Sequence, residues 1–509
     1  MFNLNDIPHI DEINNHGLYA GAREKRTATF SERYHNQNKV VPSLEEAIRR
    51  TGLKDGMTIS FHHHFRNGDH VINMVVDKLA EMGFKNLTLA ASSLASVHSH
   101  LIPHIKAGVI THIETSGLRG ELAEEVSRGL MDCPVVFRSH GGRASAIRSG
   151  DLHIDVAFLG APSCDPYGNA NGYSRDDDSG IACGSLGYAR VDATYADNVI
   201  IITNNLVAYP NAPWAIPEFQ VDYVVVTDDI GDPKGIMSGA TRYTKDPKEL
   251  LIAKTAANVI DAAGYLYDGF SMQMGSGGAS LATARFLRQK MLDRNIRCRF
   301  ALGGITGQIA AMHAEGLIDR ILDVQSFDLD AALSLKDNHF HHQIGASYYA
   351  SHMVAAAVDQ LDFVILSALE IDTDFNVNVL TGSDGVIRGA IGGHPDTAEG
   401  ASLSVVVAPL TRGRIPTIVP HVNTVVTPGA VVDVVVTDQG IAVNPKRPDV
   451  REKLEAAGLH VFDIRQLQHR AEALVGEPDP IRYKDRIVGV VMYRDNTIID
   501  VIRQIDEDE

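Results

Sequence analysis

Short apolar runs alternate with segments of helical periodicity along most of the chain. Residues 57–61 have the length and composition of a β-strand, and residues 71–80 have helical spacing that stops before Gly83, a residue typical of a helix C-terminus. Further strand-like runs follow at 87–90, 134–137, 154–159, 199–202 and 223–226. Continuous apolar strands separated by helices are typical of a parallel-rich sheet covered on both faces. The pattern predicts an α/β protein.

The pattern also repeats. The apolar run around Asp155 resembles the run around Asp362, and residues 224–228 resemble residues 434–438. Both separations are about 210 residues, a size typical of one domain. We therefore predict a tandem duplication, with an N-terminal arm over 1–40, a first domain over 41–242 and a second domain over 243–509. Runs at 486–493 and 497–502 predict a C-terminal hairpin in the second domain, because the polar residues between them suit a turn.

An acidic and amide-rich motif occurs once in each predicted domain. Asp165, Asn169 and Asn171 in the first half match Asp372, Asn376 and Asn378 in the second half. Short Asp and Asn side chains favour Asx turns, in which they hydrogen-bond to nearby backbone groups. We expect the two copies to be structural turns.

Composition narrows the class of protein. The 509 residues are 44% hydrophobic and 22% charged, as in ordinary globular proteins, and exceed the size of one core. The net charge of −18 argues against binding to nucleic acid or to an anionic membrane. Four widely spaced cysteines, no apolar run long enough to span a bilayer and an N-terminus without a signal-peptide pattern predict a cytoplasmic protein.

Three glycine-rich loops are the main candidates for chemistry. They are formed by Gly275, Ser276, Gly277 and Gly278, by Gly303 and Gly304, and by Gly392 and Gly393. None of them has the spacing of a dinucleotide fingerprint or of a P-loop. Glycine loops that open helices expose backbone N–H groups to an anion or a carbonyl oxygen, although glycine also serves simply to relieve crowding in turns. We expect these loops to contact a ligand or a thioester carbonyl.

The histidine-rich segment His62, His63 and His64 raises the question of a metal. Alternate strand residues share a face, so we expect one of His62 and His64 to face the interior and the other histidines to be solvated. No metal-ligand spacing accompanies the segment, and no metal site is predicted.

Two arginines lie near glycines and are candidates for binding a polycarboxylate. Arg66 follows the histidine-rich segment, and Arg143 follows a Gly-Gly pair. A guanidinium pairs with a carboxylate through two parallel hydrogen bonds. We predict Arg66 and Arg143 as substrate-binding residues, together with His64 and Asn67 of the same segment as Arg66.

Longer segments resemble a known superfamily. Residues 361–378, the Gly392-Gly393 loop and the 275–278 loop are similar to the second half of coenzyme A transferases of the tandem α/β type. Residues 60–69 and the full length resemble, within that superfamily, the α chains of citrate lyase. The resemblance covers essentially the whole chain. It implies two duplicated coenzyme A transferase-like domains and an enzyme that exchanges acetyl for citryl on a thioester, within the cleavage of citrate to oxaloacetate and acetate.

The resemblance also implies partners and a carrier. It implies a lyase complex with a β lyase subunit and a γ acyl carrier protein, and we expect a homo-oligomer of this chain as well. The thioester carrier would be acyl-CoA or the phosphoribosyl-dephospho-coenzyme A arm of the carrier protein, with no cofactor bound covalently to this chain.

One departure from the superfamily bears on mechanism. Ordinary members carry a Ser-Glu-Asn-Gly motif whose glutamate forms a covalent thioester, whereas the matching run, residues 301–307, contains Gly303 and Gly304 and no glutamate. Its absence favours transfer within a ternary complex over a covalent enzyme intermediate. Two alternatives stay open: a citramalate-specific or other coenzyme A transferase, and a non-catalytic effector-binding protein on the same scaffold.

Overall fold

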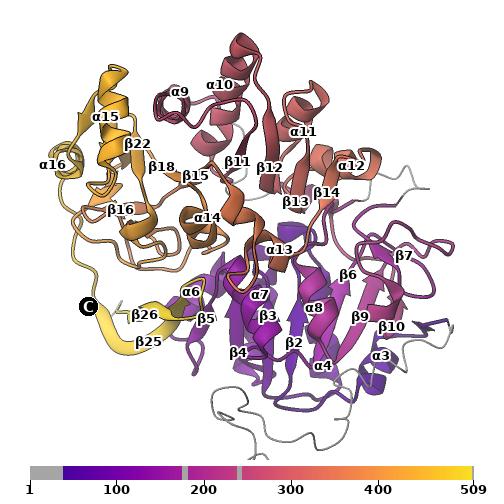
Figure 1. The fold of residues 1–509 in the computed structure, drawn as a ribbon. Helices are drawn as coiled ribbons and strands as arrows, with labels where there is room; N and C mark the ends of the chain where they lie inside the picture. Colours follow the sequence, from indigo (N-terminus) through magenta and orange to yellow (C-terminus); the bar gives the residue numbers. More distant parts are fainter. Residues whose placement is uncertain (1–37, 175–181, 238–243, 507–509) are drawn as a thin grey trace, which may run out of the picture.

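Two large, mainly parallel sheets form the framework of the protein (Figure 1). The computed structural model describes residues 38–174, 182–237 and 244–506. The first sheet has the strand order β1-β10-β9-β6-β2-β3-β4-β5-β25-β26, and the second has the order β14-β13-β12-β11-β15-β18-β22-β23-β24. The predicted α/β class is confirmed. The predicted N-terminal arm lies almost entirely outside the described residues.

The strands are short and consist mostly of apolar residues. Those of the first sheet are β1 (Val40–Val41), β2 (Thr58–Phe61), β3 (Leu87–Ala91), β4 (Ile110–Thr115), β5 (Val135–Phe137), β6 (Val156–Gly160), β9 (Asn198–Thr203), β10 (Tyr223–Val226), β25 (Tyr483–Met492) and β26 (Ile498–Ile505). Those of the second sheet are β11 (Phe270–Met274), β12 (Cys298–Ile305), β13 (Ile321–Ser326), β14 (His341–Gln343), β15 (Phe363–Ser367), β18 (Leu403–Val407), β22 (Val434–Thr437), β23 (Gly440–Val443) and β24 (Val461–Phe462). Small ladders are formed by β7 (Ser163–Cys164) with β8 (Ala170–Asn171), by β16 (Glu370–Asp372) with β17 (Val377–Asn378) and β21 (Ile418–Val419), and by β19 (Thr411–Arg412) with β20 (Ile415–Pro416).

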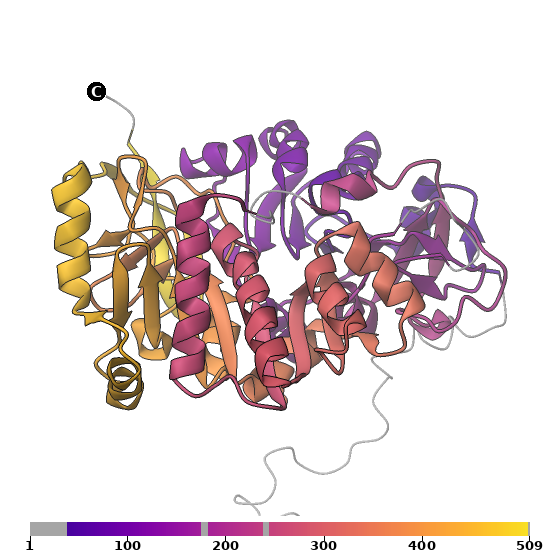
Figure 2. The ribbon, with the colours of Figure 1, turned by 90° about the horizontal axis from the view of Figure 1, so that it is seen from above.

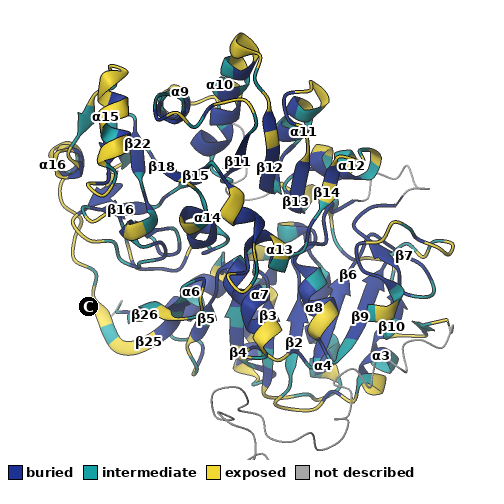
Figure 3. Ribbon diagram, viewed as in Figure 1, coloured by how far each residue is buried: buried dark blue, intermediate teal, exposed yellow. Residues whose placement is uncertain are grey.

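Helices cover the sheets and are capped by local sequence. In the first half they are α3 (Leu44–Thr51), α4 (Val71–Glu81), α5 (Ile102–Lys106), α6 (Glu121–Ser127), α7 (His140–Ser149) and α8 (Ala189–Tyr195). In the second half they are α9 (Pro247–Ala262), α10 (Gly278–Arg294), α11 (Gly307–Ala314), α12 (Leu329–Asp337), α13 (Ala346–Ala350), α14 (His394–Gly400), α15 (Pro448–Ala456) and α16 (Ile464–Val475). Asp246 accepts a hydrogen bond from the Lys248 N–H, which begins α9 at the predicted junction between the halves. The strands are largely buried, and exposed residues concentrate on the outer faces of the helices (Figure 3).

The strand order confirms the predicted duplication. In the first sheet β5-β4-β3-β2-β6-β9-β10 are consecutive neighbours, and in the second sheet β14-β13-β12-β11-β15-β18-β22 follow the same order. The loop after β2 is therefore the counterpart of the loop after β11. The two halves lie against each other with the elements α7, α8, α13 and α14 at their junction, and the view from above shows them as two adjacent layers (Figures 1 and 2). The exact boundary predicted at 242/243 stays a prediction.

The C-terminal hairpin forms as predicted, but it extends the first sheet. β25 pairs in parallel with β5 through Val490 and Val136, and β26 pairs antiparallel with β25. The assignment of this hairpin to the second half was therefore wrong with respect to the sheet that it joins. In the first sheet β25 covers the edge of β5, whereas the corresponding strand of the second sheet, β14, stays an edge strand.

The duplicated acidic motif forms equivalent turns. The Asp165 carboxylate accepts hydrogen bonds from the backbone N–H groups of residues 167–169 and from the Asn169 side chain. Asp372 accepts from the N–H groups of Asp374 and Asn376 and from the Asn376 side chain. The predicted structural role of the motif is confirmed in both halves.

Candidate active site

The two halves contact each other through the loops at the carboxyl ends of their strands. The His63 Nε2 lies 3.1 Å from the Oε1 of Gln325, near the end of β13 in the second half. The Arg66 guanidinium lies over the ring of Phe327, 4.8 Å from its centroid. Ligand sites in α/β proteins form at the carboxyl ends of the strands. The histidine-rich segment therefore lies where a site between the halves is expected.

Tyr188, just before α8, links this contact to a second histidine. Its ring stacks on His63 at a centroid separation of 5.5 Å and lies 4.3 Å from the ring of His140. Burial raises the pKa of Tyr188 well above its ordinary value, so the phenol stays protonated. The backbone N–H of His140 donates to the Gly392 carbonyl at 2.9 Å, which brings the predicted Gly392-Gly393 loop to the same place.

All three residues of the histidine-rich segment are buried, contrary to the expectation that two of them are solvated. Their exposed fractions are 4–7%. His64 is held by internal partners: its Nδ1 lies 2.8 Å from an Asp69 carboxylate oxygen and its Nε2 lies 3.0 Å from the Ile230 carbonyl. Burial alone would raise the pKa of Asp69, but the contacts with His64 and His98 more than offset it and hold this pKa below its ordinary value. His64 thus holds the histidine-rich segment in place through contacts within the first half.

The described residues that could group around a metal lie elsewhere, on the surface. They form two clusters, Asp77 with His100 and His104, and His153 with Asp155 and Asp197. Neither cluster includes a residue of the histidine-rich segment.

Several buried histidines are neutral, and this makes stability depend on pH. Burial lowers the pKa of His62 and of His394 to about 4 and that of His140 to about 3. Burial raises the pKa of Asp396 to about 6. Between pH 4 and 6.5 these three histidines are protonated in the unfolded chain but not in the folded chain, so the free energy of unfolding falls as pH falls. Asp396 has the opposite effect below pH 6, because its carboxyl binds a proton in the folded chain before it does so in the unfolded chain.

Burial also lowers the pKa of His63 well below its ordinary value, so four histidines against one carboxyl leave a net loss of stability on acidification. We expect the free energy of unfolding to fall by roughly 3–4 kcal/mol from pH 6 to pH 5, since each net proton contributes about 1.4 kcal/mol per pH unit. Urea unfolding at several pH values between 5 and 8 measures this change in the free energy of unfolding. The variant His153→Gln, at an exposed histidine, should show the same slope as the parent chain. A flat profile would mean that the buried histidines are charged.

Gly303 and Gly304 lie near the end of β12, where no side chain fits at either position. Gly303 has φ +99°, a region that favours glycine, and a Cβ there would lie 2.5 Å from the Gln273 side chain. A Cβ added at Gly304 would collide with the ring of Phe327. The space into which a side chain at position 304 would project is therefore occupied by an aromatic ring, whose face is in turn covered by Arg66.

The Gly392-Gly393 loop connects to the Gly303-Gly304 loop through two side chains. A Cβ at Gly393 would lie 2.5 Å from the Tyr349 hydroxyl, and this hydroxyl accepts a hydrogen bond of 2.8 Å from Gln273. Gln273 packs in turn against Gly303. The fold thus brings together two of the three predicted glycine loops.

The third predicted loop, residues 275–278, has neighbours of its own. The Gly275 N–H donates to the Ile365 carbonyl at 2.7 Å, and Gly277 is the N-cap of α10. A Cβ at Gly277 would collide with Ser367, and one at Gly278 would lie 2.6 Å from a Glu249 carboxylate oxygen. Close packing therefore explains these glycines, and their predicted contact with a thioester stays a prediction.

The predicted substrate-binding arginines have different surroundings. Arg143 is buried and forms a bidentate ion pair with Asp192 at 2.7 and 2.9 Å, so its charge is neutralised within the first half. Arg66 has φ +54°, which is unusual for a residue with a side chain, and donates from Nη1 to the Ile236 carbonyl. Asn67 is exposed, and its Oδ1 accepts the Val97 N–H. Of these residues, Arg66 reaches the second half through its contact with the Phe327 ring.

Sequence reasoning missed several residues that the fold gathers here: Arg119, His140, Tyr188, Gln273, Gln325, Phe327 and Tyr349. They come from six separate segments and show no common spacing. Two of them have neighbouring glycines that could have drawn attention to them. Arg119 lies between Gly117 and Gly120, and His140 begins a helix next to Gly141 and Gly142.

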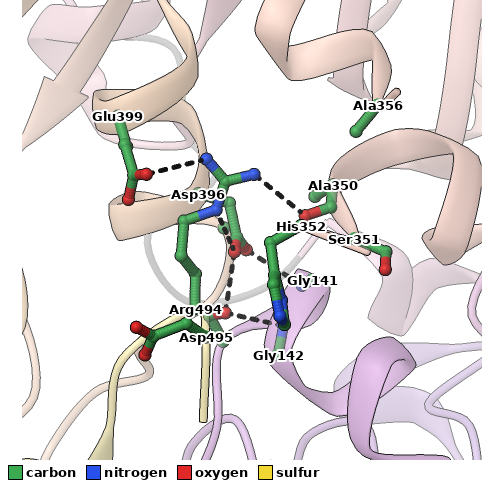
Figure 4. A network of polar contacts seen from close by, with 12 residues as sticks. Gly141, Gly142, Ala350, Ser351, His352, Ala356, Asp396, Glu399, Arg494 and Asp495 are labelled. Carbon is green, nitrogen blue, oxygen red and sulfur yellow. Dashed lines mark hydrogen bonds and ion pairs between the residues drawn. The ribbon is translucent and has the colours of Figure 1, made fainter. Parts of the chain in front are cut away.

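A buried polar network fastens the tip of the C-terminal hairpin to both halves (Figure 4). Arg494, 4% exposed, lies 3.6 Å from carboxylate oxygens of Asp359 and of Glu399 and 3.9 Å from Asp396. Asp396 accepts hydrogen bonds from the Gly141 N–H at 3.0 Å and from the Ser139 hydroxyl at 2.8 Å, both at the start of α7. Since Asp396 lies in the helix that follows Gly393, the network joins the first half to the Gly392-Gly393 loop.

Comparison with solved structures defines the class of protein. The malonate decarboxylase alpha subunit from Acinetobacter baumannii is 15% identical, with a TM-score of 0.63 over 89% of this chain and 96% of that chain. RipA from Yersinia pestis is 16% identical, with a TM-score of 0.61 over 89% and 99%. The chain therefore shares the tandem α/β fold of these proteins. No helix among the described residues is long and apolar enough to cross a membrane.

Closer relatives define the family. The family model for the citrate lyase alpha subunit matches residues 37–505. Citrate lyase alpha chains of Escherichia coli (strain K12) and Klebsiella pneumoniae are each 57% identical, over 94% and 96% of this chain and 93% and 95% of theirs. A Streptococcus mutans structure described as the alpha subunit of citrate lyase in complex with citrate is 56% identical, with a TM-score of 0.90 over 93% and 92%. The chain belongs to the citrate lyase alpha subunit family. The prediction that it is the transferase subunit of citrate lyase is confirmed.

Proposed function

We propose that this chain exchanges acetyl for citryl on a coenzyme A-like thioester without a covalent enzyme intermediate. Family membership and the citrate bound by the Streptococcus mutans relative support citrate as the acyl acceptor. The observation that carries the mechanism is the ring of Phe327 in the space beside Gly304. A glutamate side chain does not fit at position 304, within the run of residues 301–307 that matches the glutamate-bearing motif of the superfamily.

The citrate carboxylate then acts as the nucleophile itself. It attacks the carbonyl carbon of the acetyl thioester, the C–S bond breaks, and the carrier thiolate leaves an acetyl–citryl anhydride behind. The thiolate next attacks the citryl carbonyl, a new C–S bond forms, and acetate leaves with the bridging oxygen. A carboxylate enters and a carboxylate leaves, so no net proton transfer is required. The task of the protein is orientation and stabilisation of the oxyanions.

Named groups fit these tasks. Backbone N–H groups of the Gly303-Gly304 and Gly392-Gly393 loops are candidates for the oxyanions, and neutral His140 lies beside Gly392, with a Cβ there 3.6 Å from its Nε2. Arg66 is the candidate partner of a citrate carboxylate, and Arg143, neutralised by Asp192, positions the start of α7 in this proposal. The 275–278 loop is proposed to contact the carrier, with Asn67 and His64 supporting Arg66.

The proposal extends to the assembly. The carrier is acyl-CoA or the phosphoribosyl-dephospho-coenzyme A arm of a γ acyl carrier subunit, and a β lyase subunit cleaves the citryl thioester. The chain itself holds no covalent cofactor and forms a homo-oligomer in the cytoplasm. We place the boundary between the two coenzyme A transferase-like domains between residues 242 and 243.

Isotope transfer in a single turnover tests the mechanism. With the chain in excess over acetyl-CoA and with citrate labelled by ¹⁸O in its carboxylates, the acetate released should carry one labelled oxygen, because the bridging oxygen comes from citrate. Mass spectrometry of the acetate and of citryl-CoA measures it. A glutamyl route would release unlabelled acetate in the first turnover, since that oxygen would come from the enzyme.

Controls separate the activity from its alternatives. Citramalate in place of citrate, at the same concentration, should react at least 10-fold more slowly, because a buried group built to pair with a missing carboxylate is left unpaired. Faster turnover with citramalate would assign the chain to that substrate. No citryl-CoA and no acetate, with either CoA or carrier thioesters, would contradict the proposed function.

A further inference from the structure

The loop after β4, residues 116–120, lies between two segments of the candidate active site. Towards the second half, the Ser116 carbonyl accepts the N–H of Ile391 at 2.7 Å, and the Leu118 N–H donates to the Gly389 carbonyl at 3.2 Å. Both partners belong to the segment that leads into the Gly392-Gly393 loop, and Gly117 forms an isolated bridge with Ala390 of this segment. These contacts fix the position of Arg119 relative to that loop.

Towards the first half, the same loop packs against Ser96, and the residue after Ser96 contacts the segment that carries Arg66. A Cβ at Gly120 would lie 2.9 Å from the side chain of Ser96. The next residue, Val97, donates its N–H to the Asn67 Oδ1 at 3.2 Å. Arg119 is thus placed between the Gly392-Gly393 loop and Arg66 by contacts on both of its sides.

Arg119 is a charged group with nothing to neutralise it among the described residues. No hydrogen bond or ion pair to any described residue involves its guanidinium, whereas Arg138 and Arg143 of the following segment both pair with acids. Burial lowers the pKa of Arg119. Burial, and then the charge of Arg119, lower the pKa of Arg66 to about 10. A partly buried cation beside a second one is costly unless an anion compensates it.

We propose that Arg119 acts with Arg66 as a two-arginine clamp for the carboxylates of citrate that do not react. The proposal rests on the function proposed above. Citrate has three carboxylates; one attacks the thioester, and two remain as anions that two guanidiniums match in number and charge. Bidentate pairing with planar carboxylates suits arginine better than lysine.

The clamp predicts selectivity as well as affinity. A monocarboxylate such as acetate leaves at least one guanidinium unpaired, which favours its release after each exchange. A substrate lacking one carboxylate should lose binding for the same reason, because a desolvated cation without its partner is penalised strongly.

Kinetics of the full-length chain test the clamp. Arg119→Gln should raise KM for citrate by 10-fold to 100-fold while KM for acetyl-CoA changes less than 2-fold, and Arg119→Lys should recover only part of the loss. Calorimetry with citrate alone, without any thioester, should show weaker binding by a similar factor. Arg285→Gln, at an exposed arginine of α10, is the matched control and should match the parent chain.

The outcomes separate the clamp from other roles. An increased KM for acetyl-CoA with unchanged citrate binding would assign Arg119 to a phosphate of the carrier and overturn the proposal. A lowered unfolding temperature with unchanged citrate affinity would make it a structural residue and overturn it as well. If the parent chain binds citrate through Arg119 but releases no acetate, the clamp stands and the proposed transfer fails.

Discussion

Gly304→Glu is expected to abolish acyl exchange rather than to restore a covalent mechanism. The new side chain would begin in the space held by the Phe327 ring, so the ring or the end of β12 must move. Displacement of about 1 Å at a catalytic loop can reduce the rate by about 100-fold, and overpacking costs about 1–3 kcal/mol of stability. We expect at least a 100-fold loss of citryl-CoA formation and no hydroxylamine-sensitive acyl-enzyme. Acetate release and mass spectrometry of the treated protein measure both.

A double-mutant cycle isolates the steric cause. Gly304→Ala alone should destabilise the chain, and the added change Phe327→Ala should relieve part of that loss, with a coupling energy of about 1–3 kcal/mol. The control is Gly345→Ala, since a Cβ there would make only an ordinary contact of 3.6 Å with Arg190. Additive effects of the two changes, or an active Gly304→Glu variant with a trapped acyl-enzyme, would contradict the interpretation of Phe327.

Arg494→Ala is expected to weaken the junction of the halves more than any exposed arginine change. Its side chain is 5% exposed and faces Asp396 and Glu399 (Figure 4). It also lies near Asp359, and its removal leaves Asp396 buried without a cation. Breaking a buried ion pair on one side typically costs about 3–5 kcal/mol. Urea unfolding should show a loss of this size, and acyl exchange should fall because Asp396 lies in the first turn of α14, directly after the Gly392-Gly393 loop.

Two comparisons test whether the charge or the packing matters. Arg49→Ala removes an arginine that is 64% exposed and forms a surface ion pair with Glu45, and the free energy of unfolding should stay close to that of the parent chain. Asp396→Asn combined with Arg494→Ala should be less destabilising than the sum of the single changes, because no unpaired charge remains. Equal losses for Arg494→Ala and Arg49→Ala would show that the network does not fasten the hairpin.

The resemblance to coenzyme A transferases allowed site residues to be predicted where the relevant residues lie within one short segment. The absence of a glutamate in residues 301–307 was visible from the sequence, and so was Arg66 beside the histidine-rich segment. The reason for the absence was not visible, because Phe327, which reaches position 304, directly follows the neighbouring strand β13. The pairing of Arg143 with Asp192, 49 residues away, was invisible for the same reason.

Local patterns by themselves determined the α/β class, the duplication and the paired Asx turns. Apolar periodicity and short-range hydrogen bonding act over a few residues, and a repeated pattern implies a repeated unit. Tertiary structure alone decided which sheet receives the C-terminal hairpin, that all three histidines from His62 to His64 are buried, and that Arg119 lies between Arg66 and the Gly392-Gly393 loop. These features arise where segments far apart in the chain meet. The spacing of residues within one segment does not determine which other segment will bury it or pair with it.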